Sequence, residues 1–407
     1  MRVLIFNTSC HSGSTGKIAY NFLQYLRDNG HEAKLLYRGP YELEGEIDDD
    51  DCIPLTTKTR ALYSAFMTRL TGYEGYYCNK ATRKAIRIIE SFKPDIIQFY
   101  NLQGYYVNYY DLLRYIKAKD LRLVMTIICE QPYVGKCTTR HGCEKYKTQC
   151  DNCPQFKVYP ESWFFDRSRY LYNLKGAIYK GFKNLLFIAP QWVKETAEQS
   201  AIMKGQKIIA LDEPINYEGL YYPRDTTELR KRLSISKENK VIIGIGPMSN
   251  KGKGGGYYMK LAEMLKEHKE LSFVFVNYDN NDYVPDNVIT TPRLETNEEV
   301  AEYFSMGDIF VSTTYIDTQA DTCLEALGCG TPLCGFAERG TPYIAIPPYG
   351  IFTKTFDMDA LAKVVLDCPK KTKEISDACV EYARSRFDKK AVYSKTIEIY
   401  KQLLNQK

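Results

Sequence analysis

The chain has 407 residues, of which 44% are hydrophobic and 26% are charged, and its formal net charge is +5. This length suggests two or three domains whose cores can fold without disulfides or metal. Because acidic and basic residues are interspersed and the net charge is small, the composition argues against a dedicated nucleic-acid binder.

Strands and amphipathic helices alternate through the first half of the chain. We expect a helix over Lys17–Asn29, which the Asn29-Gly30 pair would end. The short β-branched runs predict strands at Arg2–Phe6, Glu32–Tyr37, Asp95–Phe99, Leu121–Ile128 and Asn184–Ile188.

A second series of strands begins after residues 189–239, a segment without strong periodicity. Its strands are expected from Lys240 (VIIGIG), at Leu271–Val276, Asp308–Thr313 and Pro332–Phe336. Two series of alternating strands and helices indicate two doubly wound α/β domains. Ligands of such sheets sit beyond the carboxyl ends of the strands, so the loop after the first strand of each half is a candidate site.

The first of these loops contains the run GSTGK. A P-loop is excluded, because the glycine spacing is two residues too short and Ile18 stands where the magnesium-binding hydroxyl belongs. A loop of small residues can still bring backbone N–H groups close to a phosphate or a sugar, or it can simply cap the helix. Its candidate residues are Gly13, Ser14, Thr15 and Gly16.

The second loop has the sequence KGKGGG. Lys251 and Lys253 flank Gly252, and the glycines from Gly254 onward precede a helix. Such a loop can approach a diphosphate closely while Lys253 neutralises it, or it can be a solvated basic turn.

Asp317 and Glu325 lie eight residues apart, after the expected strand at Asp308–Thr313. Thr322 and Glu325 have the spacing of a capping box, which predicts a helix that begins near Cys323 and ends near Gly328 or Gly330. A helix N-terminus suits a phosphate and carboxylates suit sugar hydroxyls, so a nucleotide sugar would satisfy both. Alternatively, Glu325 only closes its capping box and Asp317 is a loop residue.

Thirteen mostly scattered cysteines fit free thiols in a reducing compartment. Four of them form a dense cluster for which we consider a structural zinc site, free thiols, or two disulfides, the last being disfavoured in cytosol. The start of the chain turns polar at Asn7 and no apolar run approaches the ~20 residues of a membrane span, so we expect a cytosolic protein. The clustered cysteines are Cys137, Cys143, Cys150 and Cys153.

The segment from Lys58 to Arg87 is basic and interleaved with apolar and aromatic residues. It could rest on an anionic membrane surface and bring the site to a lipid-linked acceptor. An ordinary pair of amphipathic helices with a solvated basic face is the other interpretation.

Several motifs together resemble glycosyltransferase family 4, retaining enzymes of the GT-B fold, and its branch similar to colanic-acid and capsule biosynthesis transferases. They are GSTGKIAYNFLQYLRDNGHE, PDIIQFYNLQGYY, CEKYKTQCDNCPQ, KGKGG and DTQADTCLEALGCGTPLCGF. The resemblance implies that Glu325 holds the ribose, Asp317 the donor-sugar hydroxyls and Lys253 the diphosphate. It implies a phosphate or acceptor role for Gly13–Gly16 and no cofactor for catalysis. The donor site would also include Gly252, Gly254, Thr322 and Cys323.

The chain departs from this family on the donor side, where the usual arginine ahead of the lysine is missing between Gly246 and Lys253, and on the side of the acceptor. A His-Asp pair normally precedes the cysteine cluster, and Ile128-Cys129 stands there; another usual histidine is replaced by Gln103. Glu130 and Gln103 are the nearest polar substitutes, and with Asp317 they are the candidate catalytic residues.

The resemblance thus predicts two Rossmann-like domains that face each other across a cleft. Residues 1–205 would bind the acceptor, with a Cys-rich insertion at 129–155, residues 206–387 would bind the nucleotide sugar, and 388–407 would form a helix returning to the first domain. We expect a cytoplasmic hexosyltransferase, soluble or peripheral at the inner face of the membrane, that moves a sugar from a UDP- or GDP-linked donor to a surface-glycan or lipid-linked acceptor. The alternative is a non-catalytic nucleotide-sugar-binding partner subunit. A dinucleotide-dependent oxidoreductase is disfavoured because the Gly-x-Gly-x-x-Gly motif is missing.

Overall fold

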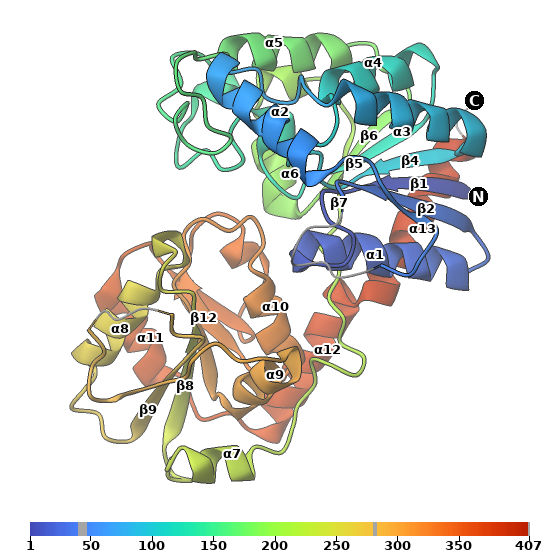
Figure 1. Cartoon of the computed structure of the whole chain (residues 1–407). Helices are drawn as coiled ribbons and strands as arrows, with labels where there is room; N and C mark the ends of the chain where they lie inside the picture. Colours follow the sequence, from blue (N-terminus) through green and yellow to red (C-terminus); the bar gives the residue numbers. More distant parts are fainter. Residues whose placement is uncertain (40–46, 280–282, 406–407) are drawn as a thin grey trace. The chain divides into compact units, whose positions relative to one another are not determined.

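The computed structural model describes residues 1–39, 47–279 and 283–405. Its contacts divide the chain into one unit of Met1–Leu211 with Tyr393–Lys407 and a second unit of Asp212–Val392. The sequence placed the boundaries after residues 205 and 387, so these divisions fall a few residues further along the chain. Each unit has a parallel sheet with helices packed against it (Figure 1), as the predicted α/β class requires.

The first unit has a seven-stranded parallel sheet in the order β3-β2-β1-β4-β5-β6-β7. Its strands are β1 (Arg2–Phe6), β2 (Glu32–Tyr37), β3 (Cys52–Pro54), β4 (Ile96–Phe99), β5 (Leu123–Thr126), β6 (Leu185–Ala189) and β7 (Ile208–Ala210). Its helices are α1 (Gly13–Asp28), α2 (Lys58–Thr71), α3 (Asn79–Phe92), α4 (Tyr109–Ala118), α5 (Ser168–Tyr179), α6 (Gln191–Glu198) and, from Tyr393 onward, α13 (Lys389–Asn405).

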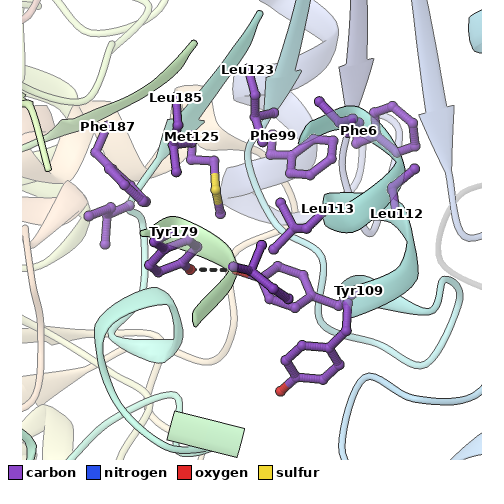
Figure 2. Packing of buried hydrophobic residues seen from close by; sticks show 14 of the residues in the cluster. Phe6, Phe99, Tyr109, Leu112, Leu113, Leu123, Met125, Tyr179, Leu185 and Phe187 are labelled. Carbon is purple, nitrogen blue, oxygen red and sulfur yellow. Dashed lines mark hydrogen bonds between the residues drawn. The ribbon is translucent and has the colours of Figure 1, made fainter. Parts of the chain in front are cut away.

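Successive residues of β1 point to opposite faces of the sheet, and each face has its own core. Leu4 and Phe6 belong to one cluster, which includes residues of α4 and the Tyr109–Tyr179 hydroxyl pair at 2.7 Å (Figure 2). Val3 and Ile5 belong to the other, which includes residues of α1 and α13. The buried Tyr400 of α13 donates its hydroxyl hydrogen to Gln98 Oε1 at 2.6 Å. The last helix is therefore part of the core of the first unit.

The second unit has a six-stranded parallel sheet in the order β10-β9-β8-β11-β12-β13. Its strands are β8 (Lys240–Ile245), β9 (Leu271–Val276), β10 (Val288–Thr290), β11 (Ile309–Ser312), β12 (Leu333–Phe336) and β13 (Gly350–Thr353). Its helices are α7 (Thr227–Arg232), α8 (Gly255–Met264), α9 (Asn297–Met306), α10 (Asp321–Gly328), α11 (Met358–Asp367) and α12 (Lys373–Phe387). Ile243 and Ile242 of β8 again serve separate cores on the two faces.

Among the residues that the structure describes, no helix is both long and apolar enough to cross a bilayer.

Candidate functional site

The loop between β8 and α8 is held tightly against the end of β11. Gly254 has φ +79°, and a Cβ atom there would lie 1.9 Å from the carbonyl oxygen of Thr313. Tyr315 N–H donates to the Gly252 carbonyl at 3.0 Å, and the Thr313 hydroxyl donates to the Gly254 carbonyl at 2.8 Å. These contacts require glycine at position 254 and fix the position of Lys253 beside the loop that follows β11.

Lys253 and Asp317 form an ion pair in this loop. The Lys253 ammonium lies 2.9 and 3.0 Å from the two carboxylate oxygens of Asp317. The Thr314 hydroxyl donates to Asp317 Oδ2 at 2.9 Å, so the carboxylate is held from two sides. The structure thus joins two residues that the sequence assigned separately to the diphosphate and to the donor sugar.

Glu325 lies in the second turn of α10, and its carboxylate is positioned by a residue far away in sequence. The Tyr221 hydroxyl donates to Glu325 Oε1 at 2.7 Å. Burial first, and the neighbouring Glu325 second, raise the pKa of Tyr221, so this tyrosine remains a hydrogen-bond donor.

The predicted capping box is wrong. Helix α10 begins at Asp321 after the N-cap residue Ala320, and no side chain caps it. Thr322 and Glu325 are therefore both inside the helix, where neither can play its part in a capping box at the N-terminus. Because there is no capping box, the interpretation of Glu325 as only a capping residue is also wrong.

The three charged residues of the predicted donor site all act on one buried thiol. Burial raises the pKa of Cys323 to about 12, the Ser312 hydroxyl lowers it, and Asp317, Lys253 and Glu325 all act on it electrostatically. The three charged groups therefore all contribute to the electrostatic environment of this one side chain. Cys323 itself is fully buried, which favours a packing role over contact with a ligand, whereas Thr322 is only half-buried.

Sequence reasoning missed two residues beside these charges. The backbone N–H of Glu213 donates to Gln319 Oε1 at 3.1 Å, and both side chains are buried. Burial raises the pKa of the Glu213 carboxyl well above its ordinary value, and nearby carboxylates raise it further. Because 106 residues separate Glu213 from Gln319, no local pattern in the sequence could have paired them. The carboxylates that raise the pKa belong to Asp321, Asp212 and Asp317.

In the first unit, Gln103 and Cys129 meet where β4 and β5 end. Gln103 Nε2 donates to Cys129 Sγ at 3.2 Å, and the Thr8 hydroxyl, which follows β1, donates to the Gln103 carbonyl at 2.6 Å. Since β1, β4 and β5 are neighbours in the sheet, the two positions that depart from the family lie at one sheet edge. Burial raises the pKa of Cys129 to about 12, so its thiol stays protonated at neutral pH.

The carboxylate of Glu130 is buried and bonded to neighbouring residues of its own segment. It is fully buried, its Oε1 lies 2.8 Å from Arg140 Nε, and its Oε2 accepts from the Arg140 backbone N–H at 2.6 Å. The Tyr133 hydroxyl donates to the same carboxylate at 2.9 Å. These contacts favour a role in holding the 130–140 segment together over a catalytic one.

The glycine loop of the first unit opens α1, which begins at Gly13. Gly13 and Ser14 are exposed, Thr15 is half-buried and Gly16 is buried beneath Ser9. No side chain caps the helix, so its N-terminal groups are not used by a capping residue. The phosphate or acceptor role of this loop stays a prediction.

The four clustered cysteines are all free thiols. Burial raises the pKa of Cys137 to about 12 and that of Cys150 to about 11, and Cys143 and Cys153 act electrostatically within the same cluster. Within the described ranges, no group of three or more His, Cys, Asp or Glu side chains is placed to hold a metal ion. The sulfurs would have to move closer together for a tetrahedral zinc site, which stays a prediction.

Comparisons with known proteins bear on the family and the fold of the chain. Residues 225–386 match the family model of the glycosyl transferases group 1. The chain is 25% identical over 169 residues to the colanic acid biosynthesis glycosyl transferase WcaC of Escherichia coli K12, covering 39% of this chain and 41% of that protein. It is 28% identical over 162 residues to the alpha-monoglucosyldiacylglycerol synthase of Streptococcus pneumoniae R6, covering 37% and 34%. The chain thus spans less than half the length of these relatives.

The solved structures include the Anabaena protein HepE in complex with UDP. It superposes with a TM-score of 0.67 at 13% identity and covers 99% of this chain and 100% of its own. The predicted GT-B fold and the resemblance to colanic-acid transferases are therefore confirmed. Residues 225–386, which lie within the second unit, are similar to the glycosyl transferases group 1 family, and the whole chain has the GT-B fold.

Proposed function

We propose that the protein is a retaining glycosyltransferase that moves a sugar from a nucleotide-sugar donor to a surface-glycan acceptor. The observation that carries the proposal is the Lys253–Asp317 pair, held by Thr314 at the end of β11 inside the matched family domain. The bound UDP of HepE and the name of WcaC support a nucleotide-sugar donor and a polysaccharide product.

The ion pair suggests how the donor enters. A diphosphate carries more negative charge than one carboxylate, so it would draw Lys253 away from Asp317. Asp317, still held by Thr314, would then accept hydrogen bonds from sugar hydroxyls. Glu325, oriented by Tyr221, would accept hydrogen bonds from the ribose.

The reaction requires no nucleophile from the protein. The bond between the sugar C1 and the diphosphate oxygen breaks, and the acceptor oxygen bonds to C1 on the same face. The acceptor proton moves to the leaving diphosphate, whose charge Lys253 stabilises. The first unit, through Gly13–Gly16 and Gln103, would contact a glycan or lipid-linked acceptor at the inner face of the membrane.

One observation favours the second candidate, a non-catalytic subunit that binds a nucleotide sugar. The usual His-Asp pair is replaced by Ile128-Cys129, and Cys129 is a half-buried residue whose thiol pKa is raised by desolvation to about 12 and whose sulfur accepts a hydrogen bond from Gln103. Neither Cys129 nor the Gln103 amide can act as a general base near neutral pH.

The experiment that separates the two is mass spectrometry of reaction products, with a panel of UDP- and GDP-sugars and lipid-linked or free glycan acceptors. A product heavier than its acceptor by one sugar, with the anomeric configuration retained, supports the transferase. Binding of a nucleotide sugar without transfer to any acceptor supports the partner subunit.

A further inference from the structure

An exposed group of large apolar side chains lies on the first unit, on α2 and the segment before α5. Three of them come from α2 and three from the segment before α5, and their exposed fractions run from 40% for Trp163 to 64% for Phe164. Large aromatic side chains are rarely exposed together on a soluble protein without a function. The group, named here the aromatic platform, consists of Leu62, Tyr63, Phe66, Trp163, Phe164 and Phe165.

Helix α2, labelled in Figure 1, exposes the large apolar side chains of Leu62, Tyr63 and Phe66. The buried face of α2 is made of the small residues Ala61, Ser64, Ala65 and Thr68. Packing of this helix onto the unit therefore leaves its large side chains outside. The plain interpretation of the segment, a helix pair whose outer face is merely polar, does not fit these residues.

The second half of the platform is fixed to the first by backbone contacts. Trp163 N–H donates to the Arg69 carbonyl at 2.7 Å, and the rings of Phe66 and Trp163 lie 5.8 Å apart, edge to face. At the end of α2, a Cβ atom on Gly72 would lie 2.4 Å from the Phe165 carbonyl oxygen. The exposed rings thus belong to a segment packed closely against α2.

The charges around the platform are mainly basic. Helix α2 carries Lys58, Arg60 and Arg69 and no acidic residue. The acidic residues of the adjoining segment are engaged within the protein. Glu161 accepts from Arg69 and from the Trp163 indole, and Asp166 accepts from the backbone N–H groups of Cys153 and Ser168.

We propose that the aromatic platform docks on an anionic lipid bilayer. Trp, Tyr and Phe side chains prefer the interface between headgroups and acyl chains, and neighbouring Lys and Arg residues are attracted to anionic headgroups. A second copy of the chain fits less well, because a twofold contact through this surface would bring two basic surfaces of like charge together. Docking by the platform does not depend on the proposed transfer reaction.

The two tryptophans of the chain allow a direct test. Trp192 packs against the core of the first unit and Trp163 belongs to the platform. In a Trp192→Phe variant, Trp163 fluorescence should shift to the blue on addition of vesicles made of equal parts phosphatidylcholine and phosphatidylglycerol. In the matched Trp163→Phe variant, the emission of Trp192 should not change. Equal responses from both variants, or none, would overturn the proposal.

Vesicle flotation, without donor or acceptor, tests the residues separately. Phe164→Ser with Phe165→Ser should lower the affinity for these vesicles roughly tenfold or more, since two apolar rings would no longer be buried. Arg60→Glu should lower it roughly fivefold, and only for vesicles that contain phosphatidylglycerol. The controls Ile346→Ser and Lys363→Glu, exposed positions of the second unit, should bind like the parent.

Protein that is folded by circular dichroism yet does not float with anionic vesicles contradicts membrane docking. If the Phe164 and Phe165 substitutions instead convert a dimer into a monomer, measured by light scattering, the platform is a contact between copies. Neither result bears on sugar transfer, which the product analysis measures with a soluble acceptor.

Discussion

Lys253 is the residue on which the donor proposal depends most directly. Lys253→Ala should weaken binding of UDP by roughly 1.5–3 kcal/mol, the value of hydrogen bonds to a charged group, and should leave the affinity for uridine nearly unchanged. Calorimetry with both ligands measures this difference. Lys251→Ala is the matched control, because Lys251 is an exposed lysine in the same loop. Equal losses for UDP and uridine would mean that Lys253 acts only by holding Asp317 and the loop.

Glu213 gives the second unit a predicted pH dependence. Because the pKa of Glu213 is raised in the folded state above its ordinary value of 4.5, the folded protein holds this proton more tightly than the unfolded chain. Its stabilising contribution is complete below pH 4.5 and is lost as the pH rises through the folded pKa. Glu213→Gln cannot ionise, so urea unfolding should show a smaller loss of stability from pH 4.5 upward. Parallel stability profiles for the parent and the variant would show that this carboxyl ionises normally.

At the scale of the secondary-structure elements, the loop before α8 requires glycine at position 254. Gly254→Ala would place a methyl group against the Thr313 carbonyl at a left-handed backbone position, and should destabilise the second unit by at least ~1–3 kcal/mol. Gly256→Ala, inside α8 with no atom within 4 Å of its added Cβ, should be neutral or stabilising by up to ~1 kcal/mol. Urea unfolding compares the two variants. Similar effects of both would refute the close approach of the loop to β11.

The cysteine segment makes a separate prediction about metal. If Cys137, Cys143, Cys150 and Cys153 close around zinc, protein purified without added metal should contain about one zinc per chain. Chelation should then lower the unfolding temperature of the first unit without changing UDP affinity in the second. Elemental analysis measures the zinc content. Reduced, folded protein without zinc would mean that the four residues are thiols, with the raised pKa values of Cys137 and Cys150.

The elements also show what a sequence alone can predict. The predicted strands at Arg2–Phe6, Glu32–Tyr37 and Leu271–Val276 coincide with β1, β2 and β9, because each is a continuous run of strand-forming residues bounded by turn signals. The three-residue strands β3, β7 and β10 were missed, since so few residues show no periodicity.

The candidate site, too, could be predicted only in part from the sequence. The motif spacing identified Lys253, Asp317 and Glu325, and in the structure Lys253 pairs with Asp317 while all three act electrostatically on Cys323. The contact of Tyr221 with Glu325 joins residues 104 positions apart. Only the folded sheet brings such residues together, so local patterns carry no signal for them.

For the whole molecule, the two units differ in how closely they follow known proteins. The family model matches residues 225–386, which lie within the second unit, and the donor-side charges are all in that range. In the first unit, Gln103 and Ile128-Cys129 occupy the positions where the family usually has histidine and His-Asp. If the proposed roles are correct, donor binding and acceptor activation reside in different units, and we expect mutation to separate them.

Restoring the missing pair tests whether acceptor activation limits the reaction. We expect the parent protein to transfer slowly with retention, since Lys253, Asp317 and Glu325 remain and the leaving diphosphate can take the acceptor proton. Ile128→His with Cys129→Asp should raise turnover, because an imidazole paired with a carboxylate can orient and deprotonate an acceptor hydroxyl. UDP affinity should stay fixed, because the donor-side groups of the second unit are unchanged. Turnover and calorimetry on the same preparations measure both quantities.

A second substitution controls for the burial of the new carboxylate. Cys129 is buried enough for the pKa of its thiol to rise to about 12, so an aspartate there needs a partner to remain ionised. The Gln103 amide, which now donates to the thiol at 3.2 Å, can donate to the carboxylate instead. Adding Gln103→Leu to the restored protein should therefore remove most of the gain in turnover, again without a change in UDP affinity. A protein that binds UDP-sugar yet transfers to no acceptor, even with the pair restored, would contradict the transferase and establish the partner subunit in its place.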